Sequence, residues 1–88
     1  MDIDKTIKDL EKNGYTNIFI WSDEKGTYYD WHNHPYEEIR IMIKGEMIIN
    51  TKNNTYHLKT GDTLKVPAGE IHNAQILEDC EYICGSKI

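Results

Sequence analysis

The sequence has no uninterrupted run of apolar residues close to the ~20 that a membrane-spanning helix requires. Basic residues are also scarce, since ten Lys and Arg stand against fifteen Asp and Glu, for a net charge of -5 at pH 7. An acidic chain without a stripe of Lys or Arg repels phosphate, so we expect no nucleic-acid partner. The segment MDIDKTIKDLEKNG is charged throughout and lacks the apolar core of a secretory signal, which predicts a cytoplasmic location and no membrane partner.

Cysteine and proline are rare, with two of each. Cys80 and Cys84 are separated by three residues in a predicted strand, where their side chains lie too far apart for a comfortable disulfide. Their spacing also differs from the C-x-x-C pair of a zinc knuckle, so we expect two reduced, packed thiols. The sequence contains no G-x-S-x-G, P-loop, H-E-x-x-H or dinucleotide-binding motif, and the enzyme classes that use these motifs find no support.

At 88 residues the chain has room for one domain with a marginal core. The pattern of residues 1–13 predicts a short amphipathic helix, because the apolar residues Ile3, Ile7 and Leu10 are spaced as on one face of a helix and Asn-Gly follows as a helix stop. Residues 14–88 contain short runs rich in β-branched and aromatic residues, separated by turn sequences. These runs are 15–21, 27–32, 38–43, 46–51, 55–59, 63–67, 72–77 and 80–84. Eight short strands predict an all-β closed barrel or jelly roll after the helix.

Two of the four histidines lie one residue apart in the segment WHNHPYEE, at His32 and His34. Side chains alternate between the faces of a strand, so these two imidazoles share one face, either as a polar strand edge or as half of a metal site. Glu38 has the same parity and Glu37 has the opposite one, which favours Glu38 as a third ligand. His72 follows the PAGE turn and is the best-placed fourth ligand.

The spacing around these residues is G(x)5HxH(x)3E(x)6G from Gly26 to Gly45 and G(x)5PxG(x)2H from Gly61 to His72. The two patterns resemble the paired motifs of the cupin superfamily over roughly residues 26–76. The resemblance implies a small cupin-type β-barrel in which one metal ion is bound by four side chains from the two motifs. In this sequence those four are His32, His34, Glu38 and His72.

Three imidazoles and one carboxylate form an N3O donor set, which suits one divalent ion of Mn, Fe, Co, Ni, Cu or Zn and contains no thiolate to select among them. If the ion prefers six ligands, two positions stay open for water, O2 or a chelating substrate. A metal site without open coordination positions would instead have a structural role. His57 is expected outside the site and exposed, because its neighbours Tyr56 and Leu58 have the core-facing pattern.

The parity of Glu38, continued along EIRIMI, places Arg40 on the metal face. A buried Arg needs a partner, and two alternatives are open. Arg40 either pairs with Asp30, which has inward parity on the preceding strand, or receives the carboxylate of a substrate through its planar guanidinium. Tyr28 and Tyr82 share the inward parity and would line the same pocket. We therefore expect a small, anionic, oxygen-containing ligand.

Ile39, Ile41 and Ile43 have the opposite parity and would form an apolar stripe on the outer face. Either the N-terminal helix or a second subunit must cover this stripe, and because cupins commonly dimerise we predict a homodimer. The expected function is that of a mononuclear metal-binding cupin, a small metalloenzyme using O2-dependent or Lewis-acid chemistry. The alternative is a metal-containing module that binds a small molecule without catalysis.

Overall fold

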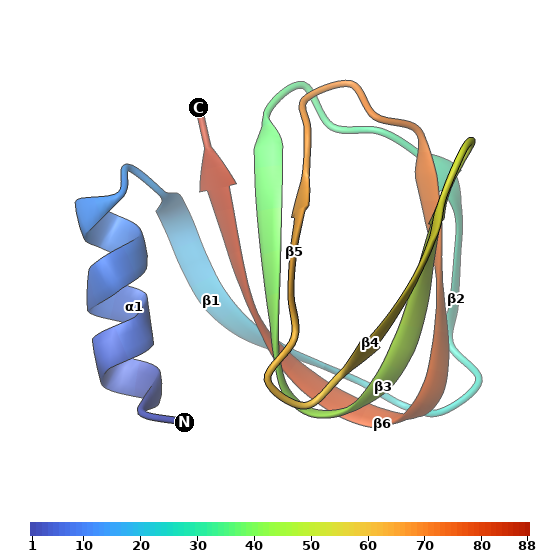
Figure 1. Ribbon diagram of the computed structural model, residues 1–88, viewed down its shortest axis with the longest axis horizontal. Coiled ribbons are helices and arrows are strands. Elements are labelled where there is room, and N and C mark those ends of the chain that lie inside the picture. The colour runs from blue at the N-terminus through green and yellow to red at the C-terminus, as the bar shows by residue number, and fades with distance from the viewer.

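The computed structural model describes all of residues 1–88. One helix precedes six strands: α1 (Ile3–Lys12), β1 (Thr16–Asp23), β2 (Tyr28–His32), β3 (Glu37–Thr51), β4 (Thr55–Lys59), β5 (Thr63–Val66) and β6 (His72–Lys87). Figure 1 shows the helix beside a sheet that folds over on itself into two facing layers. The expected all-β jelly-roll fold with a short N-terminal helix is confirmed, although the sheet is not closed into a barrel.

Strands β3 and β6 are much longer than expected. β3 runs through the Lys-Gly-Glu sequence and β6 runs through the break expected before Cys80, so the eight predicted strands merge into six. Both strands bend instead of ending, and the pairing between them shifts register between Met42 and Met47. Gly45 permits the bend, because its φ of 90° favours glycine and a Cβ there would lie 2.3 Å from the carbonyl oxygen of Asp79.

Each long strand contributes to both layers. The helix layer consists of β1, the second half of β6, the first half of β3, and β5. The histidine layer consists of β2, the first half of β6, the second half of β3, and β4. Between the layers lies a buried cluster that includes Met42, Met47, Ile49, Cys80 and Cys84, and both thiols are free. The face predicted to hold the metal is the interior of this sandwich.

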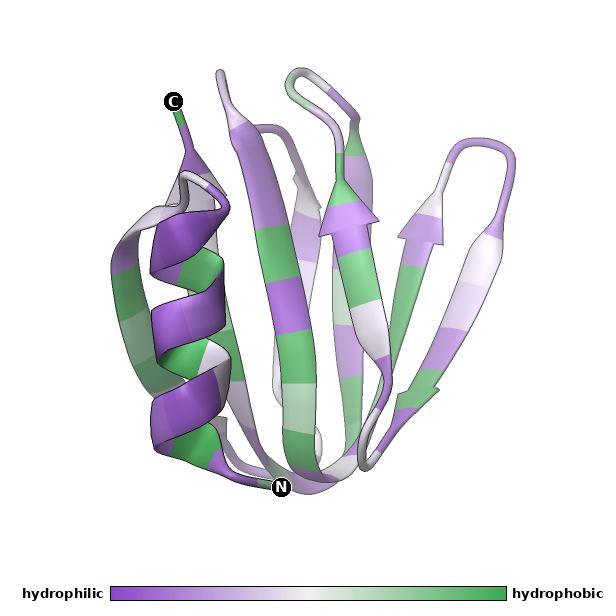
Figure 2. Cartoon of the chain, turned by 60° about the vertical axis from the view of Figure 1, so that its left-hand side comes forward, coloured by the Kyte–Doolittle hydropathy of each residue, from purple (hydrophilic) through white to green (hydrophobic).

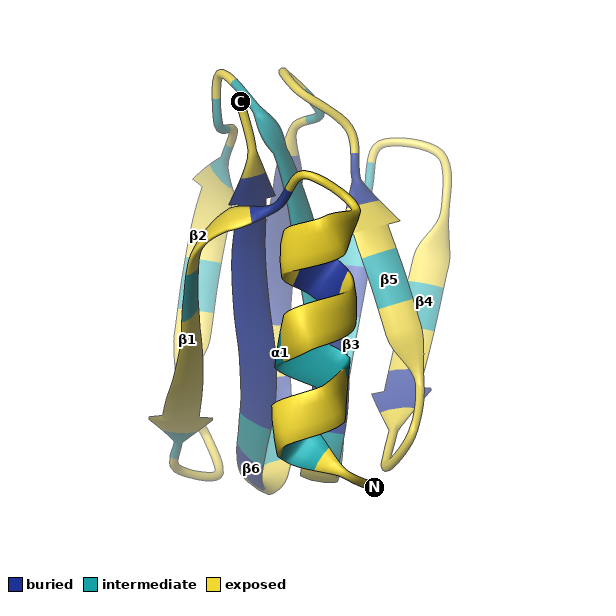
Figure 3. Cartoon of the chain, turned by 90° about the vertical axis from the view of Figure 1, so that its left-hand side faces the viewer, coloured by how far each residue is buried: buried dark blue, intermediate teal, exposed yellow.

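Helix α1 covers the outer face of the helix layer. Figure 2 shows apolar positions repeating along one side of the helix, and Figure 3 shows that the opposite side is exposed. Leu10 belongs to a cluster with Ile39, Ile41 and Ile83, against which Ile43 also packs. The helix therefore covers the predicted apolar stripe, and the stripe needs no second subunit for its burial. With ten residues, α1 is too short to span a membrane, and the structure contains no other helix.

Candidate metal centre

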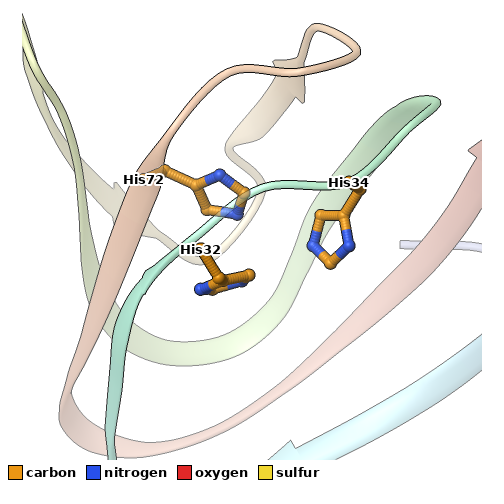
Figure 4. Close-up of side chains that lie close together, drawn as sticks. All are labelled: His32, His34 and His72. Carbon is orange, nitrogen blue, oxygen red and sulfur yellow. The ribbon is translucent and has the colours of Figure 1, made fainter.

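Three histidines from three segments converge on one point, as Figure 4 shows. His32 ends β2, His72 begins β6, and His34 lies in the loop between β2 and β3. His32 and His72 are paired across the ladder with ring centroids 4.3 Å apart, and the His34 ring lies 5.0 and 5.4 Å from them. One ligand atom of each histidine lies within 4.8 Å of the other two, close enough for the three to hold one metal ion.

Backbone carbonyls orient two of the imidazoles. Nδ1 of His32 lies 2.6 Å from the carbonyl oxygen of Asp30, and Nδ1 of His72 lies 2.8 Å from the carbonyl oxygen of Glu70. A carbonyl can only accept, so each Nδ1 carries the proton and each Nε2 keeps a free lone pair. Hydrogen bonds of this kind hold metal-binding imidazoles in the tautomer and orientation that an ion requires.

The third imidazole has a buried atom without a partner. Nε2 of His34 is the one buried side-chain nitrogen or oxygen that forms no hydrogen bond. It lies 3.0 Å from Oε1 of Glu38, but the two atoms are not aligned as a hydrogen bond. Leaving a buried polar atom unpaired is costly, and a cation placed between the nitrogen and the carboxylate would satisfy both. The residues present therefore fit a metal ion.

Burial favours the neutral, metal-binding form of two histidines. Loss of hydration is the main cause that lowers the pKa of both His34 and His72 below the ordinary value of 6.5. The negative charge of Glu38 opposes the shift at His34, and the carbonyl of Glu70 opposes it at His72. Both rings are neutral at pH 7, so no proton has to leave before an ion binds.

Glu38 lies beside the three histidines, but the ligand atoms that cluster within 4.8 Å do not include its carboxylate. Its Oε1 accepts a hydrogen bond from Nη2 of Arg40 at 2.9 Å, and its Oε2 accepts one from the hydroxyl of Ser86 at 3.1 Å. Burial alone would raise the pKa of Glu38, but the hydrogen bond and charge of Arg40 outweigh burial and lower it. The carboxylate stays ionised, and each oxygen keeps a second lone pair for an ion.

Arg40 faces the interior, as its parity predicts, but its partner within the chain is not the predicted one. Its guanidinium pairs with Glu38 at 2.9 Å rather than with Asp30. Asp30 is exposed and accepts a hydrogen bond from the hydroxyl of Tyr28, which is itself 50% exposed. The inward orientation predicted for Asp30 and Tyr28 is therefore wrong, and Tyr28 does not line the interior.

An irregularity in β2 explains this reversal. Tyr29 pairs with Ala74 and His32 pairs with His72, so three steps along β2 match two steps along β6. Such a bulge reverses the alternation of side chains beyond it. As a result Tyr29 and His32 both face the interior although their parities differ, and Tyr28 faces outward.

A cavity of about 320 Å³ lies next to the three histidines, between the two layers. Its polar lining consists of the histidine cluster and Arg40, and the other nine lining residues are apolar or aromatic. Tyr82 belongs to this wall, as its parity predicts, and so does Tyr29. Both tyrosine hydroxyls donate to Asp23 at 2.6 Å, so the rings rather than the hydroxyls face the cavity space.

Residues 19–84 match the family model described as the cupin domain, which is three quarters of the chain. No curated protein matches the sequence.

Three solved bacterial structures share the fold. A cupin-2 domain containing protein from Shewanella frigidimarina is 22% identical with a TM-score of 0.73, over 86% of this chain and 72% of that one. The DMSP lyase DddQ from Ruegeria pomeroyi is 23% identical with a TM-score of 0.74, over 81% and 37%. A predicted oxalate decarboxylase from Thermotoga maritima is 21% identical with a TM-score of 0.72, over 92% and 73%. Identities this low show the fold alone, and the chain spans little more than a third of the lyase.

Proposed function

Because the chain belongs to the cupin family, we propose that it binds one divalent transition-metal ion. The observation that carries this proposal is the set of three imidazoles whose ligand atoms lie within 4.8 Å of one another. The unpartnered Nε2 of His34 and the adjacent carboxylate of Glu38 support a fourth ligand. An N3O set suits Mn, Fe, Co, Ni, Cu or Zn. The proposed ligands are His32, His34, Glu38 and His72.

The metal-loaded protein would be a small metalloenzyme acting on a small, anionic, oxygen-containing molecule. A bound ion supplies Lewis-acid or O2-dependent chemistry. Arg40 uses one Nη2 contact to Glu38 and one Nη1 contact to the carbonyl of Ile39, and its remaining donors are available to a substrate carboxylate in the cavity. Tyr82 would act by packing, because its hydroxyl is bound to Asp23 and burial raises its pKa.

Elemental analysis of protein purified without an affinity tag or added metal tests the site. We expect one ion per chain, and we expect His72→Ala and His32→Ala to lower the metal affinity at least tenfold, because each removes a ligand whose orientation the backbone fixes. His57→Ala is the matched control, since that imidazole is exposed, contacts Glu46 at 2.8 Å and lies outside the cluster. Unchanged affinity in both ligand variants would contradict the proposal.

Magnetic resonance of the Mn(II)-loaded protein separates the enzyme from its alternatives. Exchangeable water on the ion is expected if coordination positions are open, and its absence would indicate a structural site. Binding of small anions to an open site without turnover would support a metal-containing binding module.

We also propose that the chain forms a homodimer, as cupins commonly do.

A further inference from the structure

The cavity beside the histidines has two chemically distinct parts. Arg40 is the one Lys or Arg in its lining, and it lies with the histidines, while the remaining wall is apolar or aromatic. We infer that the cavity binds a ligand with one anionic, metal-chelating head and an apolar body. This inference rests on the proposed metal site, which would receive the head. At about 320 Å³ the cavity is at the lower end of small-molecule sites, so the body is short.

The apolar wall includes two aromatic residues that the chain itself leaves uncovered. Phe19 and Trp21 line the cavity from β1, yet they are 41% and 48% exposed, with ring centroids 6.0 Å apart in an edge-to-face arrangement. The wall also includes Met47 and Ile49, which are buried. Apolar groups of a ligand that cover these exposed rings would remove aromatic surface from water, which stabilises the complex. Each CH2 group buried in this way raises the affinity about fourfold.

The polar hydrogens of the aromatic wall are already used, and its two tyrosine hydroxyls are directed to Asp23 rather than into the cavity. The hydroxyls of Tyr29 and Tyr82 donate to Asp23 at 2.6 Å, and Nε1 of Trp21 lies 3.1 Å from the same carboxylate. A ligand hydroxyl against this wall would lose its water without gaining a partner, which weakens binding. A second carboxylate there would meet no cation. The cavity therefore selects against sugar acids and against acids with a distant second carboxylate.

Titration calorimetry of 2-hydroxy acids into the Zn(II)-loaded protein tests the inference, because the head is constant and the body varies. Glycolate is the head alone, 2-hydroxybutanoate adds two carbons, and 2-hydroxy-4-methylpentanoate adds four. We expect at least tenfold tighter binding of the branched acid than of glycolate. Glycerate replaces the terminal methyl group of 2-hydroxybutanoate by a hydroxyl, and we expect it to bind about tenfold more weakly than that acid.

Neighbouring residues of β1 provide a matched pair of variants. Phe19→Ala removes part of the cavity wall and is expected to weaken binding of the branched acid at least threefold while leaving glycolate unchanged. Ile20→Ala is the control, because Ile20 is similarly exposed, at 44%, but does not line the cavity. It is expected to change neither affinity. Equal effects of the two variants on the branched acid would contradict the placement of the body.

The outcomes distinguish this inference from the proposed function. If the protein binds metal but glycolate binds as tightly as the branched acid, or glycerate as tightly as 2-hydroxybutanoate, the apolar body is wrong and the metal site stands. If the acids bind equally well after a chelator has removed the metal, the assignment of the head is wrong. If no metal binds, the proposed function and the inference fail together.

Discussion

Ser86 holds one oxygen of the proposed ligand Glu38 and thereby stabilises its charged form. The two residues are register partners on β6 and β3, and the Ser86 side chain is buried. Ser86→Ala is expected to raise the pKa of Glu38 and to lower the free energy of unfolding at pH 7 by about 1–3 kcal/mol, because the carboxylate loses a donor. Urea denaturation of the metal-free protein, with Ser22→Ala as an exposed control on β1, measures the loss.

The pH dependence of this loss has a definite sign. Glu38 has a lowered pKa in the folded protein, so its ionised form stabilises the fold above the ordinary carboxyl pKa, and this stability disappears as the pH falls through the folded value. The difference between the wild type and Ser86→Ala should therefore shrink below about pH 4. A difference that stays constant from pH 7 to pH 3 would mean that the hydroxyl acts through packing and not through the carboxylate.

His34 and His72 link the stability of the metal-free protein to pH in the neutral range. Their folded pKa values lie below 6.5, so the unfolded chain takes up protons first as the pH falls. The free energy of unfolding is therefore expected to decrease from pH 7.5 to pH 5.5, and His72→Gln should reduce the slope. Denaturation in the presence of a chelator measures it. Stability that increases toward pH 5.5 would show that the sign is wrong.

At the scale of the strand, alternation predicts side-chain direction correctly where the ladder is regular. Arg40, on β3, faces the interior of the sandwich as expected. Tyr28 and Asp30 do not face the interior, because they lie beside the bulge in β2. The bulge contains no glycine or proline that would indicate it in the sequence, and it is defined by the register of β2 against β6. His72 is distant in sequence, and only its place in the second motif brings it to the predicted site. The direction of a side chain beyond a bulge can therefore be predicted only when the pairing with the neighbouring strand is known.

The sequence pattern did not predict the bend of β3 at Gly45, because a glycine between polar residues is more typical of a turn that ends a strand. We expect Gly45→Ala to destabilise the protein by more than about 4 kcal/mol, since the new Cβ would lie 2.3 Å from the Asp79 carbonyl oxygen and 2.5 Å from Cβ of Cys80. Gly61→Ala is the matched control, with the same φ of 90° and nothing within 4 Å, and should cost about 1–2 kcal/mol. Thermal and urea denaturation compare the two, and equal losses would contradict the crowding at the bend.

At the scale of the whole molecule, the surface left open lies at the edge strand β1. Helix α1 covers the isoleucine stripe, but Ile20, which does not line the cavity, stays 44% exposed on β1, a strand that pairs only with β6. Sedimentation equilibrium at micromolar concentration is expected to give twice the mass of the chain, because a second copy would cover this apolar edge. The mass of a single chain would contradict the proposed homodimer.

Strand β6 is the partner on which the other parts of the sheet depend. β1 and β2 pair with no strand other than β6, whereas β4 and β5 each pair with β3 and do not contact β6 in the ladder. Long-range pairings of this kind form late in folding, because closing a long loop costs entropy before any contact stabilises it. His32 and His72 meet only in the β2–β6 pairing. A chain in which β2 and β6 have not yet paired would therefore lack the proposed metal site, and metal binding would report that this pairing has formed.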